Sequence, residues 1–132
     1  MVLIFGGVYQ GKLDYALTRL GLTEDDVYLC SEEDTAMPQG RKIICGLDKW
    51  ILALIRTDMN VEELTGRFIE NCENAVVICN DISCGVVPMD ADFRKWREAV
   101  GRTLGKLAQS ADEVVRLFCG IPTHIKPTGS IK

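Results

Sequence analysis

Near its start the chain carries the spacing G-x-x-x-x-G-K, in which Gly6, Gly11 and Lys12 stand where a phosphate-binding loop would place them. Glycines let backbone N–H groups approach a phosphate, and the N-terminus of a following helix adds partial positive charge. Lys12 would reach the outer phosphates as a mobile point charge. We therefore predict a phosphate-binding site formed by Gly6, Gly7, Val8, Tyr9, Gln10, Gly11, Lys12 and Leu13. The alternative is a glycine turn that only packs a helix against a sheet and leaves Lys12 in solvent.

Leu13 is the departure from the usual loop, which has Ser or Thr at this position. That hydroxyl normally coordinates Mg²⁺, and leucine has no oxygen to replace it. A bound metal stabilises the transferred phosphoryl group by several kcal/mol, and about 1.4 kcal/mol corresponds to a tenfold change in rate. We therefore expect ATP or GTP to bind without the usual Mg²⁺ ligand, and phosphate binding to survive where turnover is weak or absent.

The surrounding elements must place this loop at the edge of a sheet. Short apolar segments alternate with helical patterns, which predicts an α/β fold with a mostly parallel sheet and helices on both faces. Ligands of such folds bind at the carboxyl ends of the strands. The predicted strands are 2–5, 27–30, 42–45, 75–79, 113–119 and 123–126, and the predicted helices are 12–22, 47–56, 61–72 and about 92–109.

Length and charge limit the classes of function. The 132 residues are expected to form a single domain, with a loose tail at 127–132. The net charge of −4 with no basic run argues against nucleic-acid binding. The longest apolar run, 50–55, is too short to span a membrane. The apolar start lacks a basic n-region and is predicted as a strand rather than a signal peptide, so a cytoplasmic location is expected.

The cysteines give no metal signal. Cys30, Cys45, Cys79 and Cys119 end short apolar runs and are expected to be buried as small hydrophobic side chains. Cys79 and Cys84 form a lone C-x4-C, which is a poor zinc motif without a second pair or a nearby histidine. No metal site is predicted.

The later part of the chain has a more specific pattern. Residues 76–126 resemble the adenosylcobinamide kinase/adenosylcobinamide-phosphate guanylyltransferase family of corrinoid biosynthesis, whose members read V-x-N-E-V-G-x-G-I-V-P, then A-A-D-E-V and a final G-x-x-x-x-x-K. The family also opens with a glycine-rich loop and has L-x-x-W, matched here at Trp50. The resemblance implies a RecA-like P-loop fold, a nucleotide and a corrinoid as ligands, and a homo-oligomer, specifically a trimer. The matching positions are Asn80, Asp81, Gly85, Val86, Val87, Pro88, Gly101, Ala111, Asp112, Glu113, Val114, Gly120 and Lys126.

Departures from the family pattern affect its chemistry. Leu13 replaces the family's Ser, and Cys45 stands at the position of its acidic metal ligand. The family's nucleophilic histidine has no counterpart in residues 31–41, and the only histidine, His124, lies in the last predicted strand. Asp81 is the remaining candidate catalytic residue, because a carboxylate there could hold a metal or accept a hydroxyl proton. Its alternative role is to cap a turn.

Three functions follow from these observations. The first is a nucleotide- or phosphate-binding protein that resembles the family but has weak or no catalysis. The second is an active, shortened cobinamide kinase that uses ATP or GTP. The third is a non-catalytic subunit that binds protein and leaves the loop empty. Guanylyl transfer is not expected in any of them.

Overall fold

A computed structural model describes residues 1–7, 11–82 and 91–126. Three segments for which the sequence analysis makes predictions lie outside these residues: the loop positions 8–10 (Val8, Tyr9 and Gln10), the loop 83–90 and the tail 127–132. The strands are β1 (Val2–Gly6), β2 (Val27–Leu29), β3 (Ile43–Cys45), β4 (Val76–Asn80), β5 (Glu113–Phe118) and β6 (Ile121–Lys126). The α-helices are α1 (Lys12–Leu20), α2 (Leu47–Arg56), α3 (Val61–Asn71) and α4 (Ala91–Ser110), and a short 3-10 helix spans Glu24–Asp26.

The strands form one six-stranded sheet in the order β2-β3-β4-β1-β5-β6. All neighbouring strands are parallel except β6, which pairs antiparallel with β5 through a tight turn. The first strand therefore lies inside the sheet, between β4 and β5, so that the loop that follows it leaves from the middle of the carboxyl edge. This arrangement confirms the predicted α/β class and is that of a RecA-like P-loop fold.

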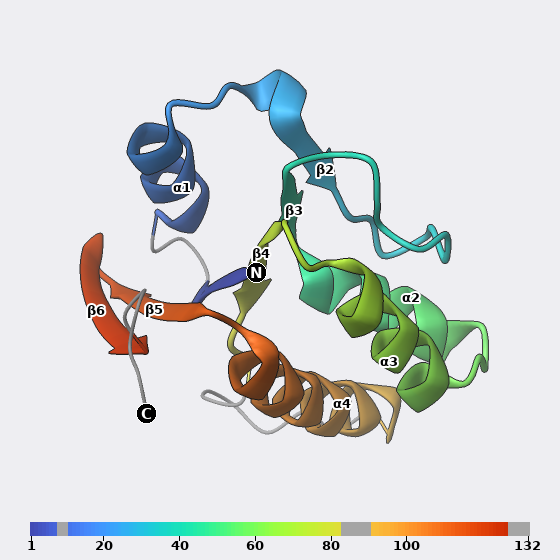
Figure 1. Ribbon diagram of the computed structural model, residues 1–132. Coiled ribbons are helices and arrows are strands. Elements are labelled where there is room, and N and C mark those ends of the chain that lie inside the picture. The colour runs from blue at the N-terminus through green and yellow to red at the C-terminus, as the bar shows by residue number, and fades with distance from the viewer. Residues whose placement is uncertain (8–10, 83–90, 127–132) are drawn as a thin grey trace.

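Helices cover both faces of the sheet, as predicted. Figure 1 shows α1 on one side of the sheet, and α2, α3 and α4 together on the other. Side chains alternate along each strand, so Leu3 packs in the core beneath α2, α3 and α4, whereas Ile4 packs in the core beneath α1. The same alternation places Val77 beneath the three helices and Ile78 beneath α1. Strands buried on both faces explain why their sequences are continuously apolar.

Most element boundaries lie within one or two residues of the predicted ones. Helix α1 ends at Leu20 because Gly21 adopts the left-handed conformation (φ 65°) and its N–H bonds the carbonyl of Leu17. The prediction that Cys119 is buried is wrong. Strand β5 ends one residue earlier, at Phe118, and Cys119 lies exposed in the β5–β6 turn with φ 52°. Its apolar neighbours in sequence could not reveal a turn that begins inside the run.

The described part of the chain contains no helix that is both long and apolar enough to cross a membrane.

Candidate functional site

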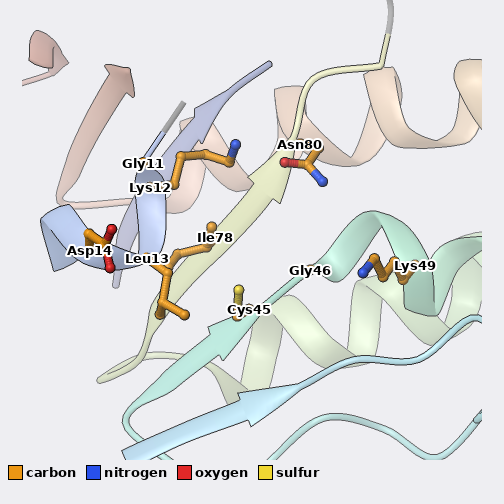
Figure 2. A pocket seen from close by; sticks show the side chains of 9 residues that line it. All are labelled: Gly11, Lys12, Leu13, Asp14, Cys45, Gly46, Lys49, Ile78 and Asn80. Atoms are coloured by element: carbon orange, nitrogen blue, oxygen red, sulfur yellow. The ribbon is translucent and has the colours of Figure 1, made fainter. Parts of the chain in front are cut away.

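A pocket of about 230 Å³ lies at the carboxyl edge of the sheet, where the starts of α1 and α2 meet the ends of β3 and β4. Figure 2 shows its lining side chains, which come from four separate elements. Three of the residues predicted to bind phosphate are among them. The lining residues are Gly11, Lys12, Leu13, Asp14, Cys45, Gly46, Lys49, Ile78 and Asn80.

Lys12 is held in this pocket rather than in solvent. The residue is 6 % exposed, and Nζ donates a hydrogen bond of 2.6 Å to the carbonyl oxygen of Gly7, within the glycine-rich segment. Burial lowers the pKa of the Lys12 amine, and the nearby carboxylate of Asp48 opposes that shift. The part of the alternative that leaves Lys12 in solvent is therefore wrong, whereas phosphate binding by the loop stays a prediction. The amine is a partly desolvated cation whose charge an incoming anion would stabilise.

Two helices begin at the pocket with glycine caps. Gly11 precedes α1 with φ 79°, and Gly46 precedes α2 with φ 83°; neither cap provides a side-chain hydrogen bond to its helix. The first N–H groups of a helix have no intrahelical acceptor, and they carry the positive end of the helix dipole. Both glycines line the pocket. Two uncapped helix starts and the Lys12 amine thus make this edge of the sheet favourable for an anion.

The first glycine of the loop is required by the sheet. Gly6 pairs with Asn80 on one side and Leu117 on the other, and its φ is 154°. A Cβ atom at this position would lie 2.4 Å from the carbonyl oxygen of Leu117. The carbonyl of Gly6 also accepts a 2.7 Å hydrogen bond from the backbone N–H of Asp81. Gly6 therefore lets β1 and β5 approach closely at the end of β1.

Two positions of the pocket, Leu13 and Cys45, lack the oxygen ligands that usually hold Mg²⁺ in a phosphate-binding loop, whereas the carboxylate of Asp14 and the amide of Asn80 also line it. Leu13 contributes only carbon, and Cys45 contributes a thiol. Burial and the charge of Asp48 raise the pKa of the Cys45 thiol, although Lys12 and Lys49 act in the opposite direction. Mg²⁺ prefers oxygen ligands in octahedral geometry. Across residues 1–7, 11–82 and 91–126, no group of three His, Cys, Asp or Glu side chains could hold a metal ion.

The predicted catalytic residue Asp81 lies beside the pocket. It follows the last residue of β4, is partly buried, and donates its backbone N–H to Gly6. Among the described residues, Asn80 is the residue at the end of β4 that lines the pocket. The catalytic role of Asp81 stays a prediction.

Sequence reasoning missed two residues at this site, Asp48 and Lys49. Lys49 is exposed and lines the pocket from the first turn of α2. Asp48 is 3 % exposed and accepts hydrogen bonds from Asn80. One signal in the sequence could have indicated Asp48. It is an acidic residue in the first turn of a strongly apolar helix, and this helix directly follows a strand at the edge of the sheet where ligands bind.

His124 lies on a different part of the sheet. It is in β6, and its Nδ1 is 3.3 Å from the buried carboxylate of Glu113, which also bonds Arg19 at 2.7 Å. These three side chains lie on the α1 face at the far edge of the sheet. His124 does not line the pocket at the carboxyl edge of β3 and β4.

Comparison with known proteins identifies the family. A search of curated proteins found no match. The family model for cobinamide kinase / cobinamide phosphate guanyltransferase matches residues 42–125. The matched segment begins after the glycine-rich loop, and it includes Cys45, Asp48, Asn80, strand β5 and all but the last residue of β6. Because this segment makes up well over half of the 132 residues, the chain belongs to the cobinamide kinase / cobinamide phosphate guanyltransferase family.

Proposed function

We propose that this family member binds the phosphate groups of ATP or GTP in the pocket between α1 and α2, and that it has weak or no catalytic activity. One observation carries the proposal: the buried amine of Lys12 lies in a pocket onto which two glycine-capped helices open. An anion there would accept hydrogen bonds from backbone N–H groups and from a cation that is already desolvated.

The site residues of the proposal are the predicted loop, Gly6 to Leu13, with a corrinoid as the second ligand. Family membership supports both ligand classes, since the family is described by its action on cobinamide and by guanyl transfer. Asp81 is kept as the candidate proton acceptor or metal ligand because it follows β4 at the same edge of the sheet. Guanylyl transfer is excluded from the proposal because residues 31–41 contain no histidine.

We expect nucleotide binding to be nearly independent of Mg²⁺. Leu13 and Cys45 occupy the positions where the family has its hydroxyl and acidic ligands, so a metal would gain no direct protein ligand from them. Calorimetric titration of GTP and of ATP, with Mg²⁺ and with EDTA, measures this directly. We expect dissociation constants that agree within about threefold, which is under 1 kcal/mol. Affinity at least tenfold higher with Mg²⁺ would instead favour the active kinase.

Activity is tested separately from binding. The protein is incubated with cobinamide, Mg²⁺ and either nucleotide, and a Lys12→Ala variant serves as the control. Phosphorylated cobinamide above the level of the control would establish the shortened kinase. Absence of both product and nucleotide binding, without any ligand-induced thermal shift, would favour the protein-binding subunit with an empty loop.

We also propose self-association, which the family resemblance implies as a trimer. Its physical support is a group of exposed apolar side chains on the β5–β6 hairpin: Phe118, Ile121 and Ile125 are 62 %, 66 % and 56 % exposed. Light scattering coupled to size exclusion measures the mass. We expect an oligomer that a Phe118→Ser, Ile121→Ser double variant converts to monomers, whereas a Leu29→Ser variant, exposed on the opposite edge strand, does not. A monomeric natural chain would refute the proposal.

A further inference from the structure

Asp48 is a buried carboxylate that the phosphate-binding loop does not explain. It is the second residue of α2 and only 3 % exposed. Both of its oxygens are used by one residue on another element: Oδ1 accepts from the backbone N–H of Asn80 at 3.1 Å, and Oδ2 accepts from Nδ2 of Asn80 at 3.2 Å. The main chain is held as well, because the indole N–H of Trp96 donates to the carbonyl of Asp48 at 2.7 Å.

The chemistry of this pair fixes the orientation of the Asn80 side chain. An ionised carboxylate can only accept hydrogen bonds, whereas an amide has one end that donates and one that accepts. The NH₂ group of Asn80 must therefore face Asp48, and the amide oxygen must face away from it. Figure 2 shows this arrangement: the nitrogen of Asn80 points toward α2, and its oxygen points toward the side on which the Lys12 amine lies.

The fixed amide oxygen gives one wall of the pocket a defined preference. Asn80 lines the pocket, whose other polar side chains are the cations of Lys12 and Lys49, the carboxylate of Asp14 and the thiol of Cys45. A phosphate carries only acceptor oxygens when fully ionised, so it gains nothing from a second acceptor. A hydroxyl or amide N–H of a ligand, by contrast, would find an acceptor there that cannot rotate away.

We propose that Asp48 is a positioning residue, which holds the amide of Asn80 so that its oxygen accepts a hydrogen bond from a donor group of the second ligand, beside the bound phosphate. This inference rests on the proposed function, because it assumes that the pocket receives a phosphate. It assigns the two ligands to different parts of the pocket. The lysine cations and the helix starts bind the phosphate, and the amide oxygen of Asn80 accepts a hydrogen bond from a hydroxyl or amide donor of the second ligand.

Asp48→Asn is the main test. The substitution keeps size and shape but removes the charge, and the new amide can bond either end of Asn80. The negative charge beside the phosphate site is also lost, so affinity for GTP should stay the same or rise by up to about fivefold. Affinity for cobinamide, measured by titration into the GTP-bound protein, should fall about three- to tenfold. A purely structural role would instead lower the affinities for GTP and for cobinamide together.

The exchange variant Asp48→Asn, Asn80→Asp provides the matched control. It restores a carboxylate–amide pair between α2 and β4, and its thermal unfolding midpoint should return close to that of the natural protein. It also places a carboxylate in the pocket wall, so GTP affinity should fall at least tenfold through charge repulsion. Unchanged GTP and cobinamide affinities in both variants would overturn the inference while leaving nucleotide binding established.

An NMR measurement distinguishes failure of this inference from failure of the proposed function. The side-chain NH₂ signals of Asn80 in the ligand-free protein should show slow solvent exchange in the natural chain and faster exchange in Asp48→Asn. Identical exchange in both would overturn the positioning role whatever the protein binds. If the natural chain binds neither GTP nor inorganic phosphate, the proposed function and the ligand part of this inference both fail, and the exchange data alone decide whether Asp48 fixes the amide.

Discussion

Replacing Gly6 by alanine is expected to lower the free energy of unfolding by about 3 kcal/mol or more. The added Cβ would meet the carbonyl oxygen of Leu117 at 2.4 Å, and this oxygen belongs to the backbone of a central strand. No rotamer change relieves such a contact, so β1 and β5 must separate. Gly6 also has φ 154°, a conformation that side-chain-bearing residues rarely adopt. Urea denaturation followed by circular dichroism measures the change.

Gly11→Ala is the matched control for this prediction. Gly11 also has a positive φ, of 79°, but a Cβ atom there would meet nothing within 4 Å. Only the cost of the left-handed conformation remains, about 1 to 2 kcal/mol. If the two variants lost equal stability, the close approach of β1 and β5 would not be the reason for glycine at position 6.

The order and type of the elements could be predicted because they depend on local pattern. Runs such as 75–79 are too short and too β-branched for helices, and they lie between helical repeats. The apolar run 2–5 also predicts a buried strand before a glycine turn. These signals extend over only a few neighbouring residues, and they are strong here because the central strands are covered on both faces.

The site was only partly predictable because its decisive contacts join distant residues. Asp48 and Asn80 are 32 positions apart, and nothing in the local sequence around Asp48 indicates that both carboxylate oxygens are used by one asparagine. Lys12 likewise lies in a pocket lined by residues from α1, β3, α2 and β4, which are far apart in the sequence. A motif indicates which residue types could bind phosphate, whereas burial and pairing depend on how distant elements pack together.

Replacing Lys12 by methionine is expected to reduce nucleotide affinity by roughly 10- to 150-fold, which corresponds to the loss of one charge-assisted hydrogen bond of about 1.5–3 kcal/mol. Methionine fills similar space without a charge. Burial lowers the pKa of Lys12, so the folded protein holds its charged form less favourably than the unfolded chain does. The variant should therefore be as stable as the natural protein at neutral pH, or more stable. Calorimetric titration with GTP and urea denaturation measure the two effects.

The pH dependence of stability and of nucleotide affinity distinguishes the loss of the Lys12 charge from a general loss of structure. Because the pKa of Lys12 is lowered in the folded state, the unfolded chain binds more protons between that pKa and 10.5. The natural protein should therefore gain stability relative to Lys12→Met as the pH rises through that interval. Its nucleotide affinity should fall as the pH rises through the lowered pKa of the free protein, because the amine loses its charge.

Lys49→Met is the control that compares an exposed lysine of the same pocket with the buried Lys12. Lys49 lines the same pocket, but it is exposed, so its charge is screened by water and its removal should cost only about two- to fivefold in affinity. The contrast between the two lysines tests whether a desolvated amine beside the loop provides the binding energy. Equal losses in the two variants would mean that a general positive field attracts the nucleotide. Loss of binding together with loss of folding in Lys12→Met would mean that the amine supports the structure instead.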